Sequence, residues 1–235
     1  DIRTHDAALM QVADNTKIDG VMQDEQYITL YKDEIREWLR VNEAFECFDY
    51  ASDDICIINF RGGEYIGAKY VFLPEQYWSD AIAHMRSINP MFHFVVITDD
   101  PKTAHHYFPD FEIFHFSIAK DYVTIKNAHY LILSNSSFPW FPAWTSTRLK
   151  HCVAPKYWAA YTVSDGYWST GYALTSGWTY LDRSGTFSTY ETCNDELRMN
   201  KLFTAQALFA KRDFWLIWRN FQRRISKALK LIFNR

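Results

Sequence analysis

The sequence has no apolar run long enough to cross a membrane, since no stretch approaches about 18 consecutive apolar residues. Its first residues lack the pattern of a signal peptide. Internal repeats and low-complexity tracts are also absent. Cysteine is scarce: Cys47, Cys56, Cys152 and Cys193 are far apart, and no CxxC or Cys/His spacing indicates zinc. We therefore expect four reduced thiols in a cytosolic protein.

What the chain does have is apolar residues and an uneven charge. Its 235 residues are enough for one large domain, and 48% hydrophobic and 18% aromatic residues can form a sizeable core. Residues 211–235 carry eight Lys or Arg and one Asp, a balance of +7; because the whole chain carries −3, the rest carries −10. An acidic body argues against general nucleic-acid binding, so we expect no nucleic acid as a partner.

Between about residues 51 and 155, short apolar segments alternate with segments of helical periodicity. The expected strands are 54–60, 92–98, 111–116, 130–134 and, as a last strand, 151–154. The expected helices run from Pro74 to Asn89, from Lys102 to Phe108, from Asp121 to Asn127 and onward from Ser136. Strands without polar alternation suit a sheet buried on both faces. The pattern predicts a doubly wound, Rossmann-like α/β domain with a parallel sheet.

The flanking segments are expected to be different. Apolar residues recur at helical spacing over residues 24–41, which predicts an amphipathic helix. Residues 156–190 interleave aromatic residues with Gly, Ser and Thr, which indicates an irregular cover over the sheet edge. Alternatively, these rings form platforms for a sugar, because aromatic rings pack against the apolar face of carbohydrate. A further helix is expected over residues 191–210.

Polar clusters follow the expected strands at residues 59–64, 98–100 and 134–137. Ligands of open α/β sheets bind outside the carboxyl ends of the strands, so these clusters predict one site. Arg61 precedes two glycines that let the backbone approach a ligand, and its guanidinium suits a diphosphate. The alternative is a structural ion pair of Arg61 with Asp99 or Asp100.

The residues after the fourth expected strand read as a turn and a helix N-terminus, where free N–H groups and hydroxyls favour a phosphate. A Ser or Asn cap that only satisfies the backbone is the alternative. Asp99 and Asp100 are potential metal ligands, but a second acidic cluster at the right strand end is missing, and Asp100 fits equally well as a helix cap. We assign no metal site, and we assign the eight histidines no ligand role.

Three blocks of this sequence resemble the bacterial alpha-1,2-fucosyltransferases. Residues 58–65 (INFRGGEY) are similar to that family's strand ending in His-x-Arg-Arg-Gly-Asp-Tyr, with Asn59 and Gly62 in place of the histidine and the second arginine. Residues 95–100 (VVITDD) resemble its Phe-Ser-Asp-Asp block. Residues 135–144 (NSSFPWFPAW) resemble its Asn-Ser-Thr-Phe-Ser-Trp-Trp-Gly-Ala-Trp block, the most specific of the three. The similarity covers roughly residues 20–158, without the family's Gly-rich opening.

The resemblance implies the C-terminal, donor-binding half of a GT-B-like, metal-independent, inverting glycosyltransferase. It implies no cofactor, a nucleotide sugar such as GDP-fucose as co-substrate, and a glycan hydroxyl as acceptor. Residues 1–50 are then a linker and helix from a missing N-terminal half, and 51–210 the nucleotide-sugar-binding domain. Arg61 and Glu64 are the catalytic candidates, Glu64 as a base. The donor-binding candidates are Asn59, Arg61, Gly62, Gly63, Asp99, Asp100, Asn135, Ser136, Ser137 and Phe138. A non-catalytic nucleotide-sugar or carbohydrate-binding remnant is the alternative.

Residues 211–235 predict a basic amphipathic helix, because apolar residues including Trp218, Phe221 and Ile225 share one face. Lys and Arg fill much of the remaining surface. Such a helix suits an anionic membrane surface, where lipid-linked acceptors are found. We expect a cytoplasmic protein that is peripheral on the inner face of the membrane. Packing of this helix on another part of a longer chain, or on a partner, is the alternative.

Overall fold

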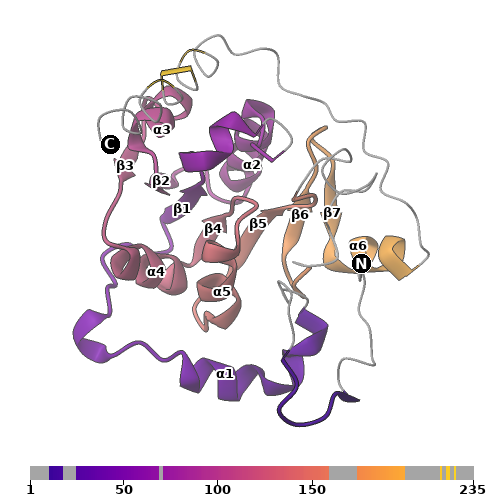
Figure 1. The fold of residues 1–235 in the computed structure, drawn as a ribbon. Helices are drawn as coiled ribbons and strands as arrows, with labels where there is room; N and C mark the ends of the chain where they lie inside the picture. Colours follow the sequence, from indigo (N-terminus) through magenta and orange to yellow (C-terminus); the bar gives the residue numbers. More distant parts are fainter. Residues whose placement is uncertain are drawn as a thin grey trace.

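The computed structural model describes residues 11–17, 25–68, 71–158 and 174–198, together with 218, 221, 222 and 225. These residues contain a seven-stranded sheet in the order β3-β2-β1-β4-β5-β6-β7 (Figure 1). The strands are β1 (Ile55–Phe60), β2 (His93–Thr98), β3 (Glu112–Phe114), β4 (Tyr130–Ile132), β5 (His151–Pro155), β6 (Thr179–Leu181) and β7 (Phe187–Thr189). The first six are parallel to their neighbours, and β7 is antiparallel to β6.

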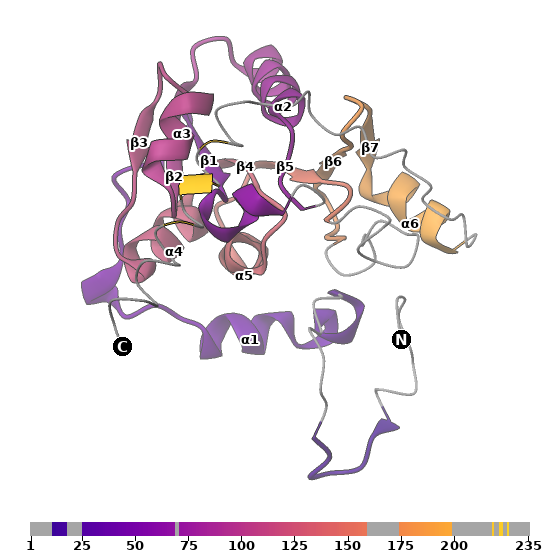
Figure 2. The same cartoon turned by 45° about the horizontal axis from the view of Figure 1, so that its top comes forward.

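Helices cover both faces of this sheet, as expected for a doubly wound α/β fold. The helices are α1 (Lys32–Trp38), α2 (Glu75–Ile88), α3 (Pro101–Tyr107), α4 (Ile118–Asn127), α5 (Ser137–Thr145) and α6 (Tyr190–Arg198). Figure 2 shows α2 and α3 on one side of the sheet and α4 and α5 on the other. In β1, Ile58 packs in the core under α2 while Ile57 packs under α5, and both are fully buried. A strand covered on both faces therefore reads as a continuous apolar run.

The strand order places β1 between β2 and β4, so the chain winds away from β1 in both directions. All six parallel strands end at the same edge. In such folds the crevice for a ligand lies at this edge, where the direction of winding reverses. Here that point is the pair of carboxyl ends of β1 and β4.

Two local signals set the starts of helices on this edge. The Asp100 side chain accepts a hydrogen bond from the Thr103 backbone N–H at 3.2 Å, and Pro101 occupies the first position of α3. The Ser117 hydroxyl accepts from the Lys120 N–H at 3.2 Å, so α4 begins at residue 118, three residues before the predicted start. The strands and helices predicted between residues 54 and 145 are confirmed, with ends that differ by a few residues.

The single helix predicted over residues 24–41 is wrong. Within the described part of this range there are two 3-10 turns, Glu25–Tyr27 and Thr29–Tyr31, followed by the seven-residue α1. Tyr27 is buried and Ile35 packs against the core, but Trp38 is 74% exposed, so the apolar spacing marks a buried face only in part. A polar contact also holds the segment, because Arg36 donates from Nε to the Thr145 carbonyl at 3.2 Å. Accordingly, α1 runs beside α5 (Figure 2).

The irregular cover predicted over residues 156–190 is also wrong where the structure describes it. Strands β6 and β7 extend the sheet beyond β5, which is therefore not the last strand. Each has only three residues and lies among Gly, Ser and Thr, so the sequence pattern is too short to distinguish it from a loop. Residues 159–173, and residues 199–210 of the predicted further helix, lie outside the described residues.

All four cysteines are free thiols, as predicted. Cys56, Cys152 and Cys193 are buried. Burial raises the pKa of the Cys152 thiol well above its ordinary value, which keeps it protonated and unreactive. Within the described part of the chain, no helix is both long enough and apolar enough to span a bilayer.

A pair of histidines at the opposite edge of the sheet predicts acid sensitivity. His84 on α2 and His151 on β5 face each other with their Nε2 atoms 3.0 Å apart, and the His84 ring stacks on Phe187 at 4.6 Å. Burial lowers the pKa of both imidazoles. The unfolded chain therefore takes up protons first as the pH falls below about 6.5, and stability is lost from there down through the lowered folded-state pKa values.

We expect the melting temperature to fall between about pH 7.5 and pH 5.5, and to fall less in His84→Gln. The control is His105→Gln, which removes an exposed histidine from α3. Thermal unfolding followed by circular dichroism measures all three proteins. Equal acid sensitivity of the wild type and His84→Gln would contradict the assignment.

Candidate functional site

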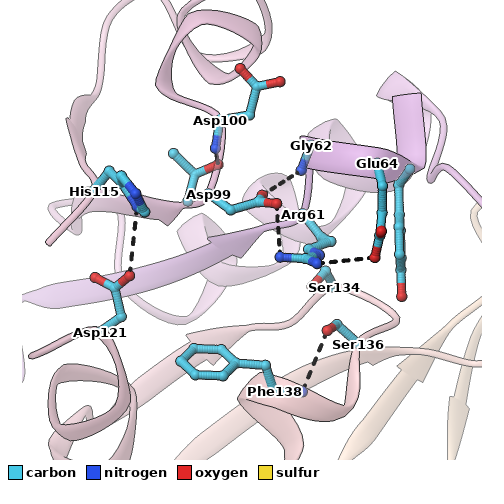
Figure 3. A network of polar contacts seen from close by, with 12 residues as sticks. Arg61, Gly62, Glu64, Asp99, Asp100, His115, Asp121, Ser134, Ser136 and Phe138 are labelled. Carbon is cyan, nitrogen blue, oxygen red and sulfur yellow. Dashed lines mark hydrogen bonds and ion pairs between the residues drawn. The ribbon is translucent and has the colours of Figure 1, made fainter. Parts of the chain in front are cut away.

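Arg61 lies directly after β1, at the edge where the direction of winding reverses. Its Nη1 is 2.7 Å from Asp99 Oδ2 and its Nη2 is 3.3 Å from Glu64 Oε1 (Figure 3). The guanidinium also lies 5.5 Å from the centre of the Tyr65 ring. This ion pair with Asp99 is the structural role that the sequence analysis gives as the alternative to diphosphate binding by Arg61. The side chain remains 32% exposed, so the contact does not bury it.

The two glycines after Arg61 pack against the turn between β2 and α3. The Gly62 N–H donates to Asp99 Oδ1 at 3.0 Å, and a Cβ on Gly62 would lie 2.7 Å from Asp100 Cβ. Gly63 has a φ of +26°, and a Cβ there would lie 2.0 Å from Asp99 Oδ2. The glycines thus allow the loop to approach the Asp99 carboxylate, which then binds both Arg61 and the Gly62 amide.

The residues that end β4 form hydrogen bonds within the protein. Ser134 donates from its hydroxyl to Asn59 Oδ1 at 2.6 Å, which joins the ends of β1 and β4. The Asn135 amide donates to the carbonyls of Val71 at 2.8 Å and Trp158 at 2.6 Å. Asn59 and Asn135 are both buried. Their side chains therefore fix the strand ends and two loops.

Ser136 caps α5, which is the role that the sequence analysis gives as the alternative to phosphate binding. Its hydroxyl accepts from the Phe138 N–H at 3.4 Å, which is long for such a bond, so this amide is only weakly engaged. Ser137 is exposed and Phe138 half-buried. Tyr65 bridges the loop after β1 to this helix start, because its hydroxyl donates to the Asn135 carbonyl at 3.4 Å and hydrogen-bonds with Ser136. Burial raises the pKa of Tyr65, so its hydroxyl stays protonated.

The two aspartates after β2 have different surroundings. Asp99 faces Arg61, whereas Asp100 is buried and accepts from the backbone N–H and the hydroxyl of Thr103, the latter at 2.7 Å. Figure 3 shows the Asp100 carboxylate pointing away from Arg61. Asp100 therefore has the capping role given as its alternative. The described residues contain no group of three His, Cys, Asp or Glu side chains able to hold a metal ion.

Two residues at this edge were missed by the sequence reasoning. His115 follows β3, and its Nδ1 lies 3.9 Å from Asp121 Oδ2 in α4 (Figure 3). Burial raises the pKa of Asp121; the Phe116 N–H and His115 oppose that shift, and Asp99 adds to it. The sequence predicted a strand over residues 111–116, which put His115 inside the strand. A strand that ends at Phe114 would have placed His115 at the carboxyl edge of the sheet.

Two cations also lie at this edge, after strands β5 and β6. Lys156 and Arg183 are buried, and Arg183 donates from Nη1 to the Phe72 carbonyl at 3.0 Å and from Nη2 to the Val71 carbonyl at 3.1 Å. Burial lowers the pKa of Arg183 to about 10. Recognition of 179–181 as a parallel strand would have placed Arg183 at this edge.

The strand order and the polar edge define a Rossmann-like, doubly wound α/β fold in which the strand order reverses between β1 and β4. No family model matches the chain, and no curated protein matches it. Among solved structures, a glycosyl transferase family 9 protein from Veillonella parvula DSM 2008 is similar, with a TM-score of 0.40 and 13% sequence identity. The match covers 94% of this chain and 63% of that protein, so this chain spans less than two thirds of its length. A similarity at this level does not define an activity.

Proposed function

We propose that this domain binds a nucleotide sugar and takes part in inverting transfer of the sugar to a glycan hydroxyl. The observation that carries the proposal is Arg61, placed after β1 and beside the N-terminus of α5 at the point where the winding reverses. Arginine binds phosphate oxygens through two N–H groups at once, and a helix N-terminus adds backbone donors and a favourable dipole. The resemblance in residues 58–65, 95–100 and 135–144 supports the same chemistry.

The contacts of Arg61 are compatible with a ligand. Its Nη2 pairs with Glu64, whose side chain is 75% exposed, and an exposed pair of this kind contributes about 0–1 kcal/mol. A charge-assisted hydrogen bond to phosphate is worth about 1.5–3 kcal/mol, so phosphate displaces Glu64. Asp99 remains paired with Nη1 and thereby orients the guanidinium group. The weakly held Phe138 amide at α5 is the nearby backbone donor.

In such a transfer, the acceptor oxygen displaces the nucleoside diphosphate at the anomeric carbon. Arg61 stabilises the negative charge that develops on the departing diphosphate. The resemblance makes fucose one candidate for the sugar, and the proposed acceptor is a surface or lipid-linked glycan. Asn59, Asn135 and Asp100 act indirectly, because their polar side-chain atoms hold the strand ends and turns in place.

One observation favours a second candidate, a non-catalytic nucleotide-sugar or carbohydrate-binding protein. Gly62 stands where the resembled family has a second arginine, so Arg61 alone follows β1 and already pairs with Asp99.

Donor hydrolysis separates the two candidates. The protein is incubated with GDP-, UDP- and ADP-sugars, and nucleotide release is measured. Release above the buffer rate with one donor class supports the transferase; binding without release supports the second candidate, and neither binding nor release contradicts both.

The basic segment 211–235 is proposed to hold the domain at an anionic membrane surface. Most of it lies outside the described residues, but Trp218, Phe221 and Ile225 are helical and exposed, at 59%, 53% and 42%. Exposed apolar residues on one helix face, among Lys and Arg, match the surface of a membrane with acidic lipids.

Deletion of 211–235 should abolish sedimentation with phosphatidylserine vesicles, and the double variant Trp218→Ser/Phe221→Ser should weaken it. Met91→Ser is the matched control, since it removes an apolar side chain that is 82% exposed and distant in sequence. The vesicle pellet and supernatant are compared for each protein, with phosphatidylcholine vesicles alongside. Equal binding of the full-length and truncated proteins would refute the membrane proposal and favour packing on a protein partner.

A further inference from the structure

His115 and Asp121 form a pair at the same sheet edge as Arg61. His115 comes directly after β3, and Asp121 lies in the first turns of α4. The Nδ1 atom of the imidazole is 3.9 Å from Asp121 Oδ2, and Figure 3 shows the two side chains pointing toward each other beside Asp99. The pair therefore lies at the same edge of the sheet as Arg61 but belongs to other elements.

Burial and a backbone hydrogen bond fix the position of the Asp121 side chain. Its side chain is only 9% exposed, and Oδ1 accepts from the Phe116 N–H at 3.2 Å. This leaves Oδ2 directed at the imidazole. His115 is 51% exposed, and its Nε2 makes no hydrogen bond or ion pair within the described residues. At 3.9 Å the Asp121 carboxylate is beyond hydrogen-bonding distance of Nδ1, but it faces that side of the ring and leaves Nε2 accessible, as a histidine general base requires.

Charged side chains lie on each element that packs around His115. Asp121 faces it from α4, and Asp99 at the end of β2 is close enough to affect Asp121 electrostatically. Lys120 on α4 is directed at the Phe116 ring, 4.3 Å from its centre, while Glu112 on β3 pairs with His93.

We propose that His115 is the catalytic base of the transfer and that Asp121 is its positioning residue; this rests on the proposed function. Nε2 takes the proton of the acceptor hydroxyl while the hydroxyl oxygen forms a bond to the anomeric carbon. The bond from that carbon to the diphosphate oxygen breaks, and its electron pair leaves with the diphosphate. His115 then returns the proton to solvent. Glu64 is less suited to this role, because its side chain is 75% exposed and its one side-chain partner among the described residues is Arg61, which the diphosphate takes over.

The experiment measures donor binding and donor hydrolysis separately, with water as the acceptor. His115→Gln should bind the donor like the wild type but hydrolyse it about a hundredfold or more slowly, since general base catalysis contributes at least that factor. Its pH–rate profile should lose the acidic limb that the wild type shows. His105→Gln, an exposed histidine on α3, is the control and should match the wild type.

Asp121→Asn tests the positioning role, since it keeps the size of the side chain but removes the charge that faces Nδ1. It should slow donor hydrolysis without changing donor affinity, and Asp121→Glu should restore part of the rate. Melting temperatures identify any variant that fails to fold. Equal hydrolysis by wild type and His115→Gln overturns the assignment of His115, as does a wild type that binds the donor without hydrolysing it. A wild type that binds no nucleotide sugar overturns the proposed function itself.

Discussion

Arg61→Lys should turn over the donor about a hundredfold more slowly than the wild type, a loss of about 3 kcal/mol of transition-state stabilisation. A lysine ammonium can still pair with Asp99 across the 2.7 Å contact, so the turn between β2 and α3 keeps its partner. It cannot supply the second N–H of a fork to the diphosphate. The melting temperature should therefore stay close to that of the wild type.

Steady-state hydrolysis of the donor and thermal unfolding, measured on the same preparations, check this prediction. Arg86→Lys is a matched control, because Arg86 lies on α2 and its guanidinium is 5.5 Å from the Phe94 ring, away from the site. Normal turnover by Arg61→Lys would remove Arg61 from the site. Loss of turnover together with a large drop in melting temperature would favour the structural ion pair.

Gly63→Ala should combine a loss of stability with a loss of donor affinity. A non-glycine residue in the left-handed region costs about 1–2 kcal/mol, and the new Cβ would also lie 2.0 Å from Asp99 Oδ2. The Asp99 carboxylate must then move, which releases both Arg61 and the Gly62 amide. Because hydrogen bonds to charged groups are worth about 1.5–3 kcal/mol, donor affinity should fall about tenfold or more.

Gly177→Ala separates the two causes. Gly177 has a φ of +81°, but a Cβ there would meet nothing within 4 Å. It should lose stability through backbone strain alone and keep its donor affinity. Chemical denaturation and calorimetric donor titration measure the two variants side by side. The same donor affinity in Gly63→Ala and the wild type would show that the contact between Gly63 and Asp99 does not organise the site.

The sequence predicts the centre of this fold because the decisive signals there are local. The apolar run of β1 ends at Arg61, and Asp100 with Pro101 marks the start of α3, so both boundaries can be read from neighbouring residues. The placement of Arg61, Asp99 and Ser136 at one edge could also be predicted from the sequence. Each follows a parallel strand, and the carboxyl ends of parallel strands lie at the same edge of a sheet.

Features that depend on distant contacts could not be read in this way. Strands β6 and β7 have three residues each, and their pairing is decided by the neighbouring strand rather than by periodicity. Asn135 looks like a ligand-binding amide, but its partners are carbonyls 64 and 23 residues away. His115 was missed because the end of β3 is set by pairing with β2. That pairing stops at Phe114, one residue before His115.

Calorimetric titration of nucleoside diphosphates and their monophosphates tests the central claim, that Arg61 binds the diphosphate of a nucleotide sugar, most directly. GDP, UDP and ADP are compared with GMP, UMP and AMP for the wild type and Arg61→Lys. We predict that one diphosphate binds the wild type about tenfold or more tightly than its monophosphate, since the second phosphate adds a charge-assisted contact, and that Arg61→Lys loses this difference. Equal affinity of the wild type for both, or an undiminished preference in Arg61→Lys, would contradict it.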